Sequence, residues 1–189
     1  MGVTKLFDRG AALYPDRTCL IDGRGARSFR DVQRRRDAIA AALLRDGVGK
    51  GDKVLLWGEN RPEWIACYWG IQLIGAIAVP IDYRSSREFA ERIRTIVDAR
   101  VVLSGDDVEP GPMAVWKLAD LDWSADGTIP AVNVDRDDIA QIVFTSGATA
   151  DPKGVIIRHR NILANVTPVA KEIDKYKKYA TPFQPIRFL

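Results

Sequence analysis

The chain has 189 residues, of which 47% are hydrophobic and 28% are charged, a composition typical of a soluble globular protein that can bury a sizeable core. Its 28 basic and 25 acidic residues leave a net charge of +3, which is too balanced to indicate nucleic-acid binding, and no basic stripe is interleaved with aromatic residues. The longest apolar run, residues 64–81, contains Gln72 and ends in Pro80-Ile81-Asp82, which favours a buried helix followed by a strand over a transmembrane segment.

The first predicted helix begins at Ser28, which can cap it with Asp31 as the capping-box partner. Apolar residues then recur at helical spacing until Gly47, which is expected to end the helix. The basic run Arg34–Arg36 is expected to lie on the solvated face of this helix.

A strand, a helix and a second strand are predicted next. Residues 54–58 form a short apolar run bounded by turn signals, as a buried strand should. Asn60 and Pro62 open a helix that runs to about Ile74. Residues 76–81 form the second strand of this unit.

The third predicted helix is capped by Ser85 or Ser86 and precedes a strand at 101–103. Strands that alternate with helices of this length indicate βαβ units. The sequence therefore predicts an α/β fold with a mainly parallel sheet and helices on both of its faces. The apolar face of the third helix is expected to consist of Phe89, Ile93, Ile96 and Val97.

The pattern changes after residue 103, which suggests three parts: a βαβ-rich part at 1–103, a loop-rich connection at 104–136, and a hairpin with a helix and an incomplete strand at 137–189. The connection is rich in glycine and proline and is expected to hold one short strand near Val115.

In the last part, strands at 139–144 and 154–158 are joined by a loop of about nine residues, consistent with a hairpin. A helix is expected from His159 until Pro168.

The hairpin loop lies within the stretch FTSGATADPKGV, residues 144–155. It combines hydroxyl side chains, glycine and a lysine, so it can present N–H groups, hydroxyls and a mobile positive charge to an anion with several oxygens, above all a polyphosphate. It is not a Walker A loop, because Pro152 stands where the second glycine belongs and Gly154 follows Lys153. Taken alone, such a loop could equally be an ordinary surface connection.

Several other residues have a structural interpretation that we prefer to a catalytic one. His159, the only histidine, is expected to start a helix or to make a hydrogen bond, in preference to acting as a general base. A cluster of Trp57, Trp64 and Trp69 is expected to belong to the core, and Asp82 to be a strand-end or turn carboxylate.

The stretch Thr145–Gly154 resembles the phosphate loop T-S-G-[ST]-T-G-x-P-K-G of the adenylate-forming superfamily, which includes acyl-CoA synthetases and the adenylation domains of peptide synthetases. Seven of the nine specified positions match, and the two departures are Ala148, where the family has a hydroxyl residue, and Ala150, where it has glycine. Both departures could weaken contact with the nucleotide.

Other segments resemble the same superfamily in the same order along the chain. They are Ser28–Val32, Gly51–Val54, Gly58–Trp64, Gly75–Asp82 and His159–Asn161. Among them, the segment Gly58–Trp64 is similar to one typical of acyl-CoA synthetases, and so favours the N-terminal part of a fatty or aromatic acyl-CoA ligase over that of a peptide-synthetase adenylation domain.

The resemblance implies a ligase that couples a carboxylic acid to ATP, forming an acyl-adenylate and pyrophosphate, and then passes the acyl group to CoA. It implies that Thr145, Ser146, Gly147, Thr149 and Lys153 bind the ATP phosphates and that Thr145 helps to ligate Mg²⁺. The acid is expected to be a fatty acid whose chain length the sequence does not reveal.

The resemblance covers only the first part of the superfamily's chain. The ribose-binding aspartate and the catalytic lysine of the family's C-terminal domain have no counterpart in residues 1–189, so these residues alone are expected to be inactive. The alternative is a free-standing, non-enzymatic module that binds a partner or a nucleotide.

Two further expectations concern assembly and location. Unpaired strand edges predict a dimer or other self-association. Cys19 and Cys67 have no metal-ligand spacing, and each is expected to be a small buried side chain in a reducing compartment. No continuous apolar segment follows Met1, so no secretory signal is predicted and a cytoplasmic protein is expected.

Overall fold

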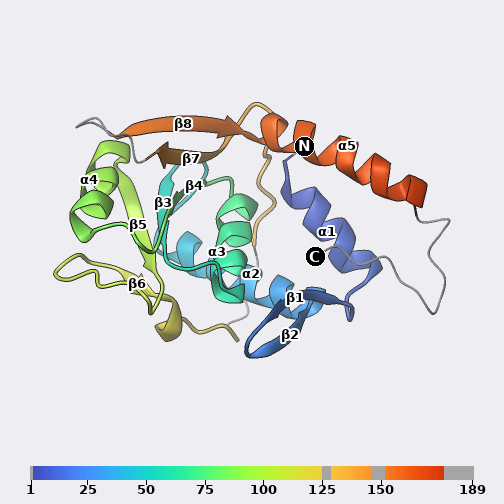
Figure 1. Cartoon of the computed structure of the whole chain (residues 1–189), viewed down its shortest axis with the longest axis horizontal. Helices are drawn as coiled ribbons and strands as arrows, with labels where there is room; N and C mark the ends of the chain where they lie inside the picture. Colours follow the sequence, from blue (N-terminus) through green and yellow to red (C-terminus); the bar gives the residue numbers. More distant parts are fainter. Residues whose placement is uncertain (1, 125–128, 146–151, 177–189) are drawn as a thin grey trace.

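The computed structural model describes residues 2–124, 129–145 and 152–176 (Figure 1). A six-stranded sheet in the order β6-β5-β3-β4-β7-β8 forms its centre, and all neighbouring strands are parallel except β7 and β8. This arrangement confirms the predicted α/β fold. The strands are β3 (Lys53–Trp57), β4 (Ile77–Ile81), β5 (Ala99–Ser104), β6 (Trp116–Lys117), β7 (Ile139–Thr145) and β8 (Lys153–Arg158).

Helices cover the two faces of the sheet. The helices α2 (Phe29–Arg45) and α3 (Pro62–Leu73) pack on one face, and α4 (Arg87–Val97) packs on the other. Because side chains alternate along a strand, β3 supplies Val54 and Leu56 to the first face and Leu55 and Trp57 to the second. Burial on both faces explains why the central strands are almost continuously apolar.

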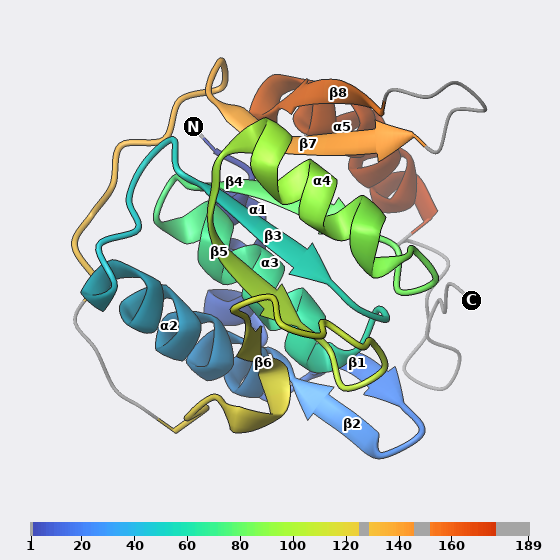
Figure 2. The same cartoon turned by 90° about the vertical axis from the view of Figure 1, so that its left-hand side faces the viewer.

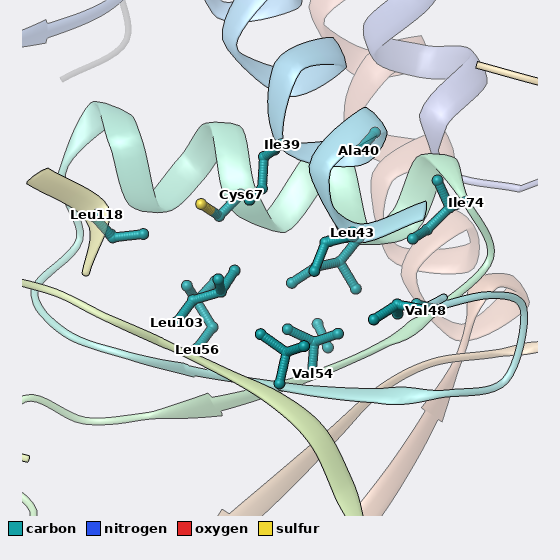
Figure 3. Packing of buried hydrophobic residues seen from close by; sticks show 14 residues of the cluster. Ile39, Ala40, Leu43, Val48, Val54, Leu56, Cys67, Ile74, Leu103 and Leu118 are labelled. Atoms are coloured by element: carbon teal, nitrogen blue, oxygen red, sulfur yellow. The ribbon is translucent and has the colours of Figure 1, made fainter. Parts of the chain in front are cut away.

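The larger core lies between α2, α3 and the sheet (Figure 3). Leu43 of α2 and Cys67 of α3 are completely buried there. In Figure 3, Cys67 faces Leu56 and Leu103 of the strands, and Leu43 faces Val54. Full burial of a leucine, isoleucine or valine side chain stabilises the folded state by about 1.5–3 kcal/mol. The burial of several such side chains in this layer therefore holds the two helices on the sheet.

Local signals place the helix ends as the sequence predicts. The Ser28 side chain accepts from the Asp31 N–H at 3.1 Å while the Asp31 carboxylate accepts from the Ser28 N–H at 3.1 Å, which completes the capping box of α2. Gly47, with a φ of 78°, follows the end of this helix in the left-handed conformation that suits glycine. Pro62 is the first residue of α3, and the Ser86 side chain caps α4.

The predicted apolar face of α4 is wrong at one position. Ile96 is 52% exposed, whereas Ala90, which was not predicted, is completely buried with Ile93 and Val97. Residues 90, 93 and 97 follow the helical repeat of three and four residues, and Ile96 lies outside that stripe. The short strand expected near Val115 is present as β6, and the 3₁₀ turn η1 (Leu118–Asp120) follows it.

The N-terminal elements were not predicted from the sequence. They are the helix α1 (Thr4–Leu13) and the two-stranded antiparallel sheet of β1 (Thr18–Asp22) and β2 (Gly25–Ser28). No side chain caps the start of α1, so the usual sequence signal for a helix start is missing. Phe7 and Ala11 of α1 are buried against Val32 of α2, so tertiary packing stabilises this helix.

The arginine run of α2 is only partly solvated, which corrects the prediction. Arg34 is exposed, but Arg36 is 4% exposed and forms ion pairs with Asp8 of α1 and Asp37. The run occupies three successive positions of a helix, so its side chains point in different directions, and Arg36 points under α1. A buried guanidinium needs such partners because an isolated buried charge is costly.

Two other expectations also need correction. Cys67 is completely buried as predicted, but Cys19 is only half-buried, because it lies on the small β1–β2 sheet at the margin of the third core cluster. The helix α5 (His159–Tyr176) continues through Pro168 and does not end there (Figure 1). A proline removes one N–H donor from a helix without preventing helical structure on both of its sides.

Of the three tryptophans predicted to form a core cluster, only Trp57 is fully buried, and Trp64 and Trp69 are partly buried at the margins of two other clusters. Trp57 packs under α4, Trp64 borders the core beneath α2 and α3, and Trp69 contacts the cluster around Phe7. The division of the chain into residues 1–103, 104–136 and 137–189 stays a prediction.

Gly70 of α3 allows α2 and α3 to approach closely. A Cβ atom at this position would lie 2.4 Å from Ile39 Cγ2 and 3.0 Å from the Arg36 carbonyl oxygen. We therefore expect Gly70→Ala to lower the free energy of unfolding by about 1–3 kcal/mol, because the backbone of α2 would have to move. Urea denaturation of the purified chain measures this change.

Gly23→Ala is the matched control, since a Cβ atom there would meet no heavy atom within 4 Å. Its stability should be unchanged or slightly raised, because alanine restricts the unfolded chain more than glycine does. Equal stability of Gly70→Ala and the parent chain would contradict this account of the α2–α3 contact.

Candidate functional site

The β7–β8 hairpin brings together two of the residues predicted to bind phosphate. Its antiparallel register places Thr145, the last residue of β7, opposite Lys153, the first residue of β8. Lys153 is exposed. Residues 146–151, which include the predicted Ser146, Gly147 and Thr149, lie outside the described residues.

The hairpin borders a hollow at the carboxyl ends of β4 and β7. The two strands pair at Ala78 and Gln141, and the hollow begins at Pro80, two residues further along β4. Its volume is about 660 Å³. It is lined by Pro80, Ile81, Asp82, Arg84, Ser85, Phe89 and Phe144. Ligands of open α/β sheets bind at the carboxyl ends of strands, so the hollow is placed where such a site is expected.

Asp82 and Arg84 form an ion pair at the mouth of this hollow. Arg84 Nε and Nη2 donate to the two Asp82 carboxylate oxygens at 3.1 and 2.8 Å, and the Arg84 N–H donates to Oδ1 at 2.9 Å. These bonds lower the pKa of Asp82 to about 2. Asp82 is therefore the turn carboxylate that the sequence predicts, and Arg84 offsets a negative charge that would repel an anion.

The sequence did not single out Arg84 or Phe144 as residues of the site. Both follow or end strands whose carboxyl ends meet, but only the pairing of β4 with β7 brings them to one hollow. For Arg84, its position two residues after Asp82 in the sequence could have indicated that it belongs to the site.

His159 connects the hairpin to the N-terminal segment. It is 1% exposed, follows directly after β8, and its Nδ1 accepts a hydrogen bond from the Val3 N–H at 3.2 Å. The main-chain N–H of His159 donates to the Asp138 carbonyl at 3.1 Å, and the Asp138 carboxylate forms an ion pair with Lys50 at 2.6 Å. The predicted structural role of His159, as a helix start and hydrogen-bonding residue, is confirmed.

The bond from Val3 fixes the protonation state of His159. Nδ1 can accept this hydrogen only in the neutral ring that carries its proton on Nε2. Burial lowers the pKa of His159, and the nearby Asp138 carboxylate opposes part of that effect. The neutral form is thus favoured in the folded chain.

No metal centre is formed by protein groups alone in the part of the chain that the structure describes, where no cluster of three or more histidine, cysteine or acidic side chains is suited to a metal ion. The role of Thr145 as a ligand of Mg²⁺, together with oxygens of ATP, stays a prediction. Within the described ranges, no helix has the length and apolar character needed to cross a membrane.

The fold belongs to the class of open, mainly parallel α/β sheets, in which ligands bind at the carboxyl edge of the sheet. The sequence model of the family described as "AMP-binding enzyme" matches residues 7–184, and the chain belongs to this family. The resemblance of its segments to the adenylate-forming superfamily is thereby confirmed.

Relatives with different names and activities share this region. The chain is 33% identical over 171 residues to phenyloxazoline synthase MbtB of Mycolicibacterium paratuberculosis, covering 89% of this chain and 15% of that protein. It is 29% identical over 188 residues to crotonobetaine/carnitine–CoA ligase of Escherichia fergusonii, covering 84% of this chain and 36% of the ligase.

A solved structure of the same family is also similar. The Klebsiella oxytoca NpsA N-terminal subdomain in complex with 3-hydroxybenzoyl-AMSN has a TM-score of 0.70 and 31% identity, covering 84% of this chain and 41% of that one. The chain thus spans less than half the length of each of these three proteins.

Because His159 is the only histidine of the chain, the effect of its protonation on stability can be measured. Because the pKa of folded His159 lies below the ordinary value, the unfolded chain binds the proton more readily, and stability should fall as the pH drops below about 6.5. In His159→Leu this part of the pH dependence should disappear, and the unpaired Val3 N–H should cost about 1–3 kcal/mol at pH 7.5. Urea denaturation between pH 7.5 and 5.5 measures both effects.

His159→Gln is the comparison variant, because it also removes the titrating ring while keeping a group able to accept a hydrogen bond. It should lose the pH dependence and retain more stability than His159→Leu. An unchanged dependence on pH in both variants would assign the effect to acidic groups and not to His159.

Proposed function

We propose that this chain provides the phosphate-binding part of an AMP-forming acid–CoA ligase. The observation that carries the proposal is the hairpin register, which sets Thr145 opposite Lys153 beside a hollow at the carboxyl edge of the sheet. Membership of the AMP-binding family supports it, because this hairpin coincides with the segment that resembles the family's phosphate loop.

In this proposal the loop holds the β- and γ-phosphates of ATP. The backbone N–H groups of Thr145, Ser146, Gly147 and Thr149 donate to phosphate oxygens, as do the hydroxyls of the serine and the threonines, and Lys153 adds a positive charge. Thr145 also contributes its hydroxyl oxygen to the Mg²⁺ that accompanies ATP.

The chemistry supported by these groups is displacement at the α-phosphorus. A substrate carboxylate oxygen forms a bond to the α-phosphorus while the bond to the pyrophosphate oxygen breaks, which gives an acyl-adenylate and pyrophosphate. Fixed donors at the leaving group stabilise its growing negative charge. The CoA thiol then displaces AMP from the acyl carbon, with loss of the thiol proton.

We propose a fatty acid as the acid, because the segment Gly58–Trp64 resembles that of acyl-CoA synthetases. The relatives include a ligase for crotonobetaine and carnitine and a phenyloxazoline synthase, so they support the activation of a small carboxylic acid more directly than any one chain length. In a protein that contains this chain, pyrophosphate exchange with a panel of fatty, aryl and amino acids would distinguish these classes. Faster exchange with amino acids than with fatty acids would overturn the fatty-acid assignment.

We also propose that the protein acts in the cytoplasm. Cys67 is a free thiol buried in the core, and Cys19 is likewise free, as expected in a reducing compartment.

Loss of the Lys153 charge should weaken polyphosphate binding. Removing one charge-assisted contact costs about 1–3 kcal/mol, so Lys153→Ala should bind Mg²⁺-pyrophosphate and tripolyphosphate about 5- to 150-fold more weakly than the parent chain. Isothermal titration of the purified 189-residue chain with each anion measures this loss.

Lys117→Ala serves as the control, since Lys117 is an exposed lysine on β6, at the opposite edge of the sheet from β8. It should bind both anions as the parent chain does. Equal affinities of Lys153→Ala and Lys117→Ala would remove Lys153 from the phosphate site and count against the proposed function.

We further propose that the chain self-associates through β8. Among the residues that the structure describes, this strand pairs with β7 alone, and Val155 and Ile156 are 50% and 56% exposed. An edge strand with exposed apolar side chains favours pairing with another chain. Sedimentation equilibrium at several concentrations should show a dimer or larger species, and Ile156→Lys should shift it towards the monomer.

Ile21→Lys tests whether any exposed isoleucine would have the same effect. Ile21 is 79% exposed but lies on the separate β1–β2 sheet. This variant should associate as the parent chain does. A single monomer mass for the parent chain at all concentrations would show that β8 does not pair between chains.

A further inference from the structure

A second crevice lies at the point where the connections of the sheet reverse direction. The chain passes from β3 through α3 to β4 on one side, and then returns through α4 to β5 on the other side of β3. The helices α3 and α4 lie on opposite faces of the sheet (Figure 2). The loop after β3 leads to α3, whereas the loop after β5 leads to β6 and packs Val108 on the α4 face. In open α/β sheets this switch point at the carboxyl ends of the strands is a preferred place for ligands.

The two loops are held together at the floor of this crevice. A Cβ atom on Gly58 would lie 3.0 Å from the Gly105 nitrogen, so the two backbones pass in close contact. The Gly105 N–H donates to the Trp57 carbonyl at 2.8 Å, and the Glu59 N–H donates to Asp107 Oδ2 at 2.9 Å. The position of the surrounding side chains is thus fixed by main-chain contacts.

The crevice has a volume of about 220 Å³ and shares no lining residue with the hollow beside the hairpin. This volume is smaller than the roughly 300–1,000 Å³ of pockets for drug-sized ligands, so it suits a molecule with the size of an amino acid. Leu118 and Trp123 give one wall an apolar surface.

The charged residues of the lining fall into two groups. In the first, Glu59, Asp106 and Asp107 act electrostatically on one cation, Arg61, which pairs with Glu59 at 3.1 Å. This group therefore has an excess of negative charge.

The remaining charged residues of the lining, Arg24, Arg35 and Glu63, have an excess of positive charge. Arg35 pairs with Glu63 at 3.2 Å and lies over the Trp123 ring, with 5.5 Å from its guanidinium carbon to the ring centroid. Arg24 is exposed at the turn between β1 and β2, and among the residues described by the structure no acidic side chain forms an ion pair with it.

We propose that this crevice binds a small zwitterion, a free α-amino acid with an apolar side chain. Its ammonium group would face Asp106 and Asp107, its carboxylate would face Arg24, and its side chain would pack against Leu118 and Trp123. A zwitterion matches the separated charges, whereas a simple anion or cation would meet repulsion on one side. The site is separate from the proposed phosphate loop and does not depend on it.

Isothermal titration of the 189-residue chain with each of the twenty common L-amino acids tests this proposal. At least one apolar amino acid, such as L-leucine, should bind with a Kd on the order of 1 mM or tighter. N-acetyl-L-leucine and L-leucinamide, which each lack one charge, should bind at least about tenfold more weakly, since one charged contact is lost. Absence of binding by all twenty, or equal binding of the blocked derivatives, would overturn the proposal.

Variants then locate the site. Arg24→Gln and Asp106→Asn should each weaken binding of L-leucine at least several-fold, and both side chains are exposed, so the fold should persist and can be checked by circular dichroism. Arg17→Gln and Asp120→Asn are matched controls at exposed positions outside the crevice and should bind normally. Equal weakening by the controls would show a general effect of net charge and overturn the site.

Lys153→Ala separates this proposal from the proposed phosphate site. It should bind L-leucine with unchanged affinity even though polyphosphate binding is reduced. Loss of leucine binding in Lys153→Ala would overturn the claim that the two sites are separate.

Discussion

The burial of β3 on both faces is the constraint on which the rest of this structure depends. Successive side chains of this strand enter two different cores, so one strand of five residues requires α2 and α3 on one face and α4 on the other. The connection through α3 runs from β3 to β4 on one face, and the connection through α4 runs back from β4 past β3 to β5 on the other face. The same reversal forms the crevice between the loops after β3 and β5.

The hairpin that contains the proposed phosphate loop is attached at the other side of the sheet. Its attachment depends on groups far apart in sequence: β7 pairs with β4, and His159 accepts a hydrogen bond from Val3. The Lys50–Asp138 ion pair adds a third connection. Binding of a polyphosphate by a short loop benefits from such a fixed base, because donors that are already placed lose less entropy when the ligand binds.

The charged groups of this protein have two distinct physical roles. Arg36 is buried with Asp8 and Asp37 as its partners, and it ties α1 to α2. Arg84, Arg24 and Lys153, in contrast, are exposed at hollows or at the hairpin, where their charge is accessible to a ligand. Net charge, which is +3, gives no indication of this division, because it depends only on which side chains the fold buries.

The sequence by itself determined the fold class, most of the helix and strand positions, and the location of the segment that resembles the family's phosphate loop. These features depend on local signals: the capping box of Ser28 and Asp31, the apolar strand at β3, and the consecutive residues of the loop.

Only the tertiary structure decided which side chains meet. Residues such as Arg84 and Phe144, or Glu59 and Asp107, are separated by tens of residues and come together because of the order of the strands. It also decided that α1 is stable without a cap, that Arg36 is buried, and that α5 continues past Pro168. The physical reason is that packing energy from distant segments can outweigh a weak or unfavourable local propensity.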